Sequence, residues 1–108
     1  MSIRIDETGD GVCRALLSGE MTIYHAAELK PALLDCIARC REIEFNLSEV
    51  VEIDTAGFQL LLLAKREAAR VGKPLRLVAH SPATLEVLDL FNMASYFGDP
   101  VVISGQVR

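Results

Sequence analysis

The sequence predicts a single α/β domain, built on a mixed β-sheet of about four to five strands with helices packed largely on one face. Patterns typical of strands and of helices alternate along all 108 residues, without a linker, a repeat or a low-complexity segment. Hydrophobic residues make up 51% of the chain, which is enough to form one core. We therefore treat residues 1–108 as one domain.

The N-terminal part of the chain predicts a hairpin followed by an amphipathic helix. Residues 2–6 and 12–17 have the composition and alternation of strands, and residues 7–11 between them are rich in turn formers. Apolar residues then recur every three or four positions from about residue 25 to residue 40, which indicates a helix. Pro31 cannot donate a backbone hydrogen bond, so we expect an irregular or 3₁₀-like first turn in this helix.

The rest of the chain alternates between strand and helix patterns. The predicted elements are a strand at 43–47, an extended stretch at 48–53, a helix at 56–71, a strand at 75–79, a helix at 83–91 and a short strand at 101–103. In sheets with helical crossovers, the functional edge lies where strands lead into helices. Asp54 and Thr55 are predicted to lie on that edge.

The charge of the chain restricts its partners. With a net charge of -4 at pH 7 and no basic stripe, it is not expected to bind nucleic acid or anionic membranes. No apolar run reaches the roughly 18 residues that span a bilayer, and the N-terminus lacks the core of a signal peptide. We therefore expect a cytoplasmic protein that is not inserted in a membrane.

The candidate metal and catalytic residues are few. Cys13, Cys36 and Cys40 lie in apolar stretches, and their odd number gives no complete disulfide framework. Cys36 and Cys40 are four positions apart on one predicted helix, but no second pair or spaced histidine completes a tetrahedral metal site. His25 and His80 lie on separate elements with no assignable nucleophile. We therefore expect core cysteines, no catalytic residue and no cofactor.

The most informative stretch runs from Glu52 to Leu63, where an extended segment leads through Asp-Thr-Ala-Gly into a strongly apolar helix. Thr55 is predicted to be the N-cap of this helix, because its hydroxyl can accept a hydrogen bond from a free backbone N–H. The same N–H groups and the helix dipole would stabilise a phosphate. Two interpretations follow from the spacing: a plain helix cap, or a hydroxyl that is phosphorylated without unfolding the helix.

The four consecutive leucines at 60–63 cover a full helical turn. A helix that packs on a sheet needs only about half of its circumference to be apolar, so some of these side chains must face away from the sheet. Either neighbouring helices cover them, or they form an exposed patch beside Thr55 on which a partner docks. In the second case the surface includes Phe58 and Leu62.

Three groups of residues carry a family resemblance: Gly19-Glu20 before the first helix, 46–48 together with Ile53-Asp54-Thr55-Ala56-Gly57, and 77–83. In this order they resemble the STAS domain of bacterial anti-sigma factor antagonists, and the likeness extends from about Leu16 to Ile103. In that family the residue after the Asp is the phosphoacceptor, usually a Ser. The resemblance therefore places the phosphoacceptor at Thr55.

The resemblance implies a non-enzymatic, phosphorylation-dependent switch of protein interactions. The implied partner is a GHKL-type serine kinase that doubles as an anti-sigma factor, and a phosphate beside Asp54 would weaken its binding by charge repulsion. The Asp-Thr-Ala-Gly-Phe-Gln-Leu-Leu-Leu sequence and the residues after it also resemble STAS proteins of chemotaxis or two-component signalling clusters. The expected partner-binding residues are Glu20, Met21, Thr22, Asp54, Ala56, Gly57, Phe58 and Leu62.

Two other functions stay open at this point. The Asp-Thr-Ala-Gly form also occurs in the small STAS subunit of the lipid-transporting ABC system of Gram-negative envelopes, where the domain steadies an ATPase. A small enzyme or ligand-binding protein would instead need a concave pocket with convergent polar groups, which so short and apolar a chain seldom encloses.

Overall fold

The computed structural model describes residues 1–90, so the predicted strand at 101–103 and the last residue of the predicted third helix lie outside the described residues. The elements are β1 (Ser2–Glu7), β2 (Val12–Met21), α1 (Ile23–Arg39), β3 (Glu42–Ile53), α2 (Thr55–Arg70), β4 (Leu75–Val78) and α3 (Pro82–Leu90). The sheet has the strand order β1-β2-β3-β4, in which β1 is antiparallel to β2 and the other pairs are parallel. The predicted mixed α/β fold is confirmed.

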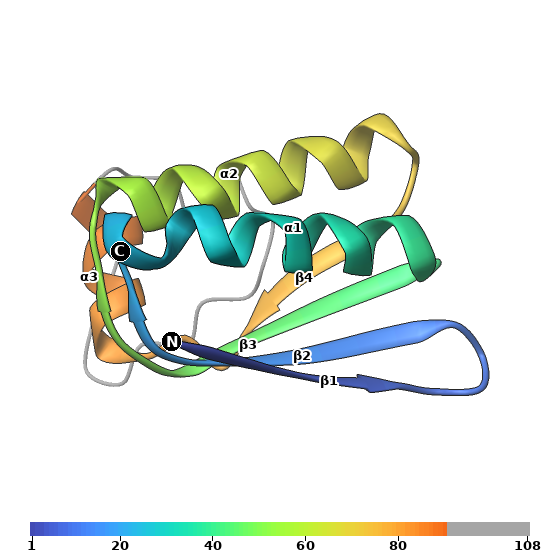
Figure 1. Cartoon of the computed structure of the whole chain (residues 1–108), viewed down its shortest axis with the longest axis horizontal. Helices are drawn as coiled ribbons and strands as arrows, with labels where there is room; N and C mark the ends of the chain where they lie inside the picture. The colour runs from blue at the N-terminus through green and yellow to red at the C-terminus, as the bar shows by residue number, and fades with distance from the viewer. Residues whose placement is uncertain (91–108) are drawn as a thin grey trace.

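Helices α1 and α2 lie side by side across one face of the sheet, and α3 lies at the end where β2 and β3 run into these helices (Figure 1). Alternate strand residues are buried because successive side chains of a strand point to opposite faces. Together with the buried stripes of α1 and α2 they form one core, which includes Cys13, Ala15, Leu17, Leu33, Ile37, Ile43, Phe45, Leu47, Leu61, Ala64 and Ala68. Among residues 1–90, no helix is both long and apolar enough to cross a bilayer.

The two central strands are longer than the sequence predicts. β2 continues through Gly19 to Met21, which we expected to be a loop, and β3 continues without interruption to Ile53. The pairing of β2 with β3 shifts register between Leu16 and Ser18 and again after Gly19, which has a φ of 107°. Glycine adopts this conformation without strain, so the strand passes the irregularity instead of ending there.

The expectation of an irregular start to the first helix is wrong. α1 begins at Ile23, two residues earlier than predicted, so Pro31 lies inside the helix and not in its first turn. Pro31 is exposed, whereas Leu29 and Leu33 on either side of it are buried. The packing of this apolar stripe maintains the helix across the residue that lacks a donor.

The leucine run is largely covered. Leu60 and Leu61 are buried, while Leu62 and Leu63 are partly buried and pack against the core. α1 packs against α2. None of the four leucines is fully exposed, so the run belongs mainly to the core.

Candidate functional site

The candidate site lies at the edge of the sheet where two parallel strands end and two helices begin. Met21, the last residue of β2, pairs with Ile53, the last residue of β3. One residue separates each strand from the helix that follows it, Thr22 before α1 and Asp54 before α2. The N-termini of α1 and α2 consequently start from neighbouring strand ends (Figure 1).

Asp54 connects the two helix N-termini. Its Oδ1 accepts a hydrogen bond of 3.0 Å from the backbone N–H of Gly57 in α2, and its Oδ2 accepts one of 2.9 Å from the N–H of Ile23 in α1. The N-cap of α2 is thus Asp54, and our prediction that Thr55 is the cap is wrong. Asp and Thr are both good N-caps, and here the carboxylate satisfies a donor of each helix, which a single hydroxyl oxygen does less well.

The charge on Asp54 is stabilised by these backbone donors. Partial burial raises the pKa of Asp54, but the N–H groups of Gly57, Ile23 and Ala56 outweigh it and hold the pKa below its usual value. The site therefore carries a negative charge at neutral pH, next to Thr55.

We expect Asp54→Asn to destabilise the protein at pH 7 by about 1–2 kcal/mol, because an amide has one acceptor oxygen for two backbone donors. A carboxyl whose pKa is lowered by folding contributes stability above its unfolded pKa, and the contribution disappears as the pH falls through the folded pKa. The difference in unfolding free energy between wild type and variant should therefore shrink below about pH 4. Urea unfolding at several pH values measures it. A difference that stays constant down to pH 2 would contradict this role.

Thr55 is the first residue of α2 and its side chain is exposed. Within residues 1–90 its hydroxyl makes no hydrogen bond, so this oxygen is open to a reagent or a partner. This placement agrees with what we expected of an acceptor, namely a helix N-terminus that is reachable from solvent.

The predicted partner-binding residues divide into two groups. Glu20 is exposed, and Asp54, Ala56 and Leu62 are partly exposed, so they remain candidates. The other four are buried in the free domain, and their part in binding a partner stays a prediction: Met21, Thr22, Gly57 and Phe58.

Gly57 is buried because α2 approaches the backbone of β2 closely. A Cβ atom at this position would lie 2.0 Å from the carbonyl oxygen of Met21 and 2.9 Å from Cγ1 of Ile53. The glycine of the Asp-Thr-Ala-Gly motif thus allows the first turn of the helix to rest on the strand end.

The exposed apolar side chains at this edge are ones that we did not single out. Ile23 and Tyr24, which open α1, are 67% and 89% exposed, and Val51 near the end of β3 is 71% exposed. Ile23 and Tyr24 begin α1 at this edge, where the N–H of Ile23 donates to Asp54, and Val51 lies three residues before Asp54 in β3. The sequence did contain a signal for Ile23 and Tyr24. They are two adjacent apolar residues directly before the apolar repeat that predicts the first helix.

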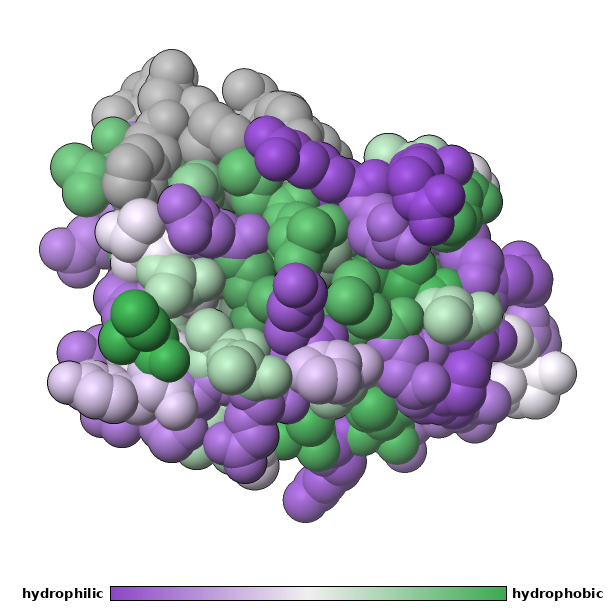
Figure 2. Space-filling model, turned by 45° about the horizontal axis from the view of Figure 1, so that its top comes forward, coloured by the Kyte–Doolittle hydropathy of each residue, from purple (hydrophilic) through white to green (hydrophobic). Residues whose placement is uncertain are grey.

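Hydrophobic side chains also gather in the middle of the helical face of the molecule, where hydrophilic ones surround them (Figure 2). Leu34 of α1 and Leu62 of α2 are partly exposed apolar residues of these two helices. Both side chains also pack against the core, so each contributes to the stability of the fold.

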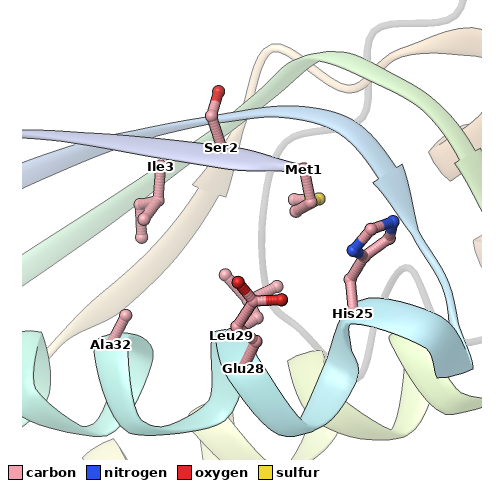
Figure 3. Close-up of a pocket in the computed structure, with 7 residues that line it drawn as sticks. All are labelled: Met1, Ser2, Ile3, His25, Glu28, Leu29 and Ala32. Atoms are coloured by element: carbon pink, nitrogen blue, oxygen red, sulfur yellow. The ribbon is translucent and has the colours of Figure 1, made fainter.

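A small hollow lies between the start of β1 and the first half of α1 (Figure 3). Its volume is about 120 Å³, and Figure 3 shows Met1 and Ile3 pointing toward the helix while Ser2 points away. His25 and Glu28 supply its polar groups. It is smaller than the usual ligand pocket and offers few convergent polar groups, so it carries no proposal of catalysis or ligand binding.

Known proteins share sequence and fold with this chain. The family described as "Mlab, STAS domain" matches residues 6–103. The intermembrane phospholipid transport system binding protein MlaB of Haemophilus influenzae is 35% identical over 57 residues, which are 53% of this chain and 54% of that protein. The match thus spans about half the length of the relative.

Solved structures share the fold at low sequence identity. An anti-sigma factor antagonist from Mycobacterium paratuberculosis has a TM-score of 0.81 at 21% identity, covering 94% of this chain and 86% of that one. SpoIIAA, an anti-sigma factor antagonist, in its unphosphorylated form has a TM-score of 0.74 at 18% identity, covering 93% and 89%. Because the family match extends over most of the sequence, the chain belongs to the STAS domain family.

Proposed function

We propose that this STAS domain is a non-enzymatic switch of protein interactions, with Thr55 as its phosphoacceptor. The observation that carries the proposal is the exposed Thr55 hydroxyl at the start of α2, adjacent to a carboxylate that is fixed by two helix N-termini. The acceptor itself performs no chemistry, since a partner would supply the phosphate.

The switch would act through charge. A phosphate adds about -1.5 to -2 charges at pH 7, and on Thr55 it would lie beside the ionised Asp54. The helix dipole tolerates an anion at this end of α2, so the fold would remain intact. An acidic surface of the partner would be repelled, and an apolar one would have to strip water from the phosphate. SpoIIAA of Bacillus has been solved in a phosphorylated form with the same fold, with a TM-score of 0.71 at 18% identity.

The proposed contact area is the strand-end surface, which we define as Glu20, Ile23, Tyr24, Val51 and Thr55. Its apolar members are exposed, and Glu20 gives it a charged rim. Exposed aromatic and aliphatic side chains together with a charged one are typical of a docking site with a small hot spot. The proposed partner is a GHKL-type serine kinase that acts as an anti-sigma factor, or a chemotaxis signalling protein, and the proposed location is the cytoplasm.

A second candidate is supported by the sequence match to MlaB. In this alternative the chain is an accessory subunit of a phospholipid transport system, and the strand-end surface binds the ATPase subunit without phosphorylation. The same exposed Thr55 would then be a contact residue. The two candidates differ in the partner and in the modification of residue 55.

The test is co-purification from the native host, with mass spectrometry of both the partner and residue 55. We expect wild type to incorporate phosphate from ATP and the partner, and Thr55→Ala to incorporate none, whereas the exposed Ser2→Ala control incorporates as much as wild type. Thr55→Ala should change the unfolding free energy by about 0.5 kcal/mol or less, since Asp54 and not Thr55 caps the helix.

Phosphate on Thr55→Ala at the wild-type level would refute the proposed acceptor. An ATPase that co-purifies with unmodified Thr55, and whose binding Thr55→Ala weakens, would favour the second candidate over the switch.

A further inference from the structure

The three cysteines are buried, as expected of core residues, but two of them also contact each other. The sulfurs of Cys13, in β2, and Cys40, which caps the end of α1, form a disulfide. Their Cα atoms are 5.9 Å apart, within the range of natural disulfides. This pair, 27 residues apart in sequence, was not predicted, since only the spacing of Cys36 and Cys40 gave a local signal.

The backbone brings these cysteines together without help from the sulfurs. The N–H of Arg41 donates a 3.0 Å hydrogen bond to the carbonyl of Gly11, and the Arg41 Nε donates one of 2.6 Å to the carbonyl of Asp10. These contacts tie the end of α1 to the β1–β2 turn, directly beside both cysteines. Once one of the two thiols carries a mixed disulfide, the other would attack it far faster than a free thiol does, because the loop between them is already closed.

Glu7 provides a partner for the sulfurs in the reduced state. Its Oε1 lies 3.8 Å from Sγ of Cys13 and 4.0 Å from Sγ of Cys40, so a thiol at either position can donate to it. Arg39 forms a salt bridge with the same carboxylate from the last turn of α1. The site therefore suits both oxidation states. The two sulfurs are bonded to each other in the oxidised state, and the Glu7 carboxylate can accept a hydrogen bond from either thiol in the reduced state.

We propose that Cys13 and Cys40 are a dithiol–disulfide couple that clamps the end of α1 to β2 when oxidised and shares the Glu7 carboxylate when reduced. The clamp lies at the opposite end of β2 from Met21, roughly 26 Å along the strand from the site at Asp54. It is independent of the proposed function, since no residue of the strand-end surface takes part.

The oxidant is a low-molecular-weight disulfide of the glutathione type. One protein thiolate attacks it, a mixed disulfide forms and one molecule of the reagent's thiol leaves. The second protein thiolate then attacks the mixed disulfide at the protein sulfur and displaces the second reagent thiol. Two electrons pass from the protein sulfurs to the reagent, and the two protein thiol protons end on the released thiols.

Cys36 serves as an internal comparison. It lies on α1 one turn before Cys40, is equally buried, and has no disulfide partner. Burial raises the pKa of the Cys36 thiol, which keeps it protonated and slow to react. Removing Cys36 therefore costs packing but leaves the couple intact.

The experiment incubates the full chain with oxidised or reduced glutathione and then alkylates the thiols under denaturing conditions. We expect mass spectrometry to find one alkylated cysteine, Cys36, in the oxidised protein and three in the reduced protein. The oxidised melting temperature should exceed the reduced one by about 10 °C or more, since the crosslink restricts the unfolded chain. Cys36→Ala should keep this redox-dependent difference, while Cys13→Ala and Cys40→Ala should abolish it.

Glu7→Gln tests the carboxylate, because a negative charge beside a thiol disfavours the attacking thiolate. We expect disulfide formation in this variant to be several-fold faster than in wild type. Three alkylated cysteines after oxidation, or a crosslink that includes Cys36, would overturn the proposal even if every variant folded poorly. The ligand atoms of Glu7, Cys13 and Cys40 all lie within 4.8 Å of one another, so zinc is the alternative occupant. Reduced wild type that retains one equivalent of zinc on these residues and resists oxidation would also overturn the proposal.

Discussion

Replacing Gly57 by Ala should lower the unfolding free energy by about 3 kcal/mol or more, and the melting temperature by more than about 10 °C. The added methyl would meet the Met21 carbonyl oxygen at 2.0 Å, and backbone on both sides cannot rotate away as a flexible side chain does. The first turn of α2 would have to lift from β2, which strains the hydrogen bonds that Asp54 makes to Gly57 and Ile23. The better helix propensity of Ala, about 1 kcal/mol, offsets only part of this cost.

Gly9→Ala is the control for this substitution. Gly9 lies in the exposed β1–β2 turn, a Cβ there meets no atom within 4 Å, and we expect a change of no more than about 0.5 kcal/mol. Thermal melts of both variants measure the difference. A Gly57→Ala protein that melts within a few degrees of wild type would mean that the approach of α2 to β2 is not required by the fold.

The fold could be predicted from the sequence because most of its elements have strong local signals. The alternation in β1 and the apolar period of α2, followed by Gly72 and Pro74, correspond to elements that the structure places within one or two residues. The C-terminal ends of β2 and β3 were predicted less well. Their last residues pair only with each other across a register shift, and this long-range pairing has no local signature.

The candidate site was predicted in location but not in detail. The Asp-Thr-Ala-Gly motif identified the correct turn, yet Asp54 and Thr55 are both good caps, so position alone could not decide between them. The deciding contact is the N–H of Ile23, which comes from a helix more than 30 residues away in sequence. The burial of Phe58 and the exposure of Tyr24 likewise depend on how α1 and α2 start from adjacent strands.

Tyr24→Asp should weaken binding of the co-purified partner by more than tenfold while leaving the melting temperature within about 2 °C of wild type. Tyr24 is 89% exposed, so an aspartate there removes no core contact. At the strand-end surface the same change replaces a large aromatic side chain, the kind that dominates binding hot spots, by a negative charge. Titration calorimetry with the partner and thermal melts of the free domain measure the two effects.

Leu62→Lys is the matched substitution on α2, and we expect it to have the opposite effects. Leu62 packs against the core and is only partly exposed, so a lysine there should cost about 1–2 kcal/mol of stability and lower the melting temperature by several degrees. The folded fraction should still bind the partner with an affinity close to that of wild type, because Leu62 lies outside the strand-end surface. If Leu62→Lys instead abolishes binding without loss of stability, and Tyr24→Asp binds normally, the partner docks on the helical face and the strand-end surface is not the contact area.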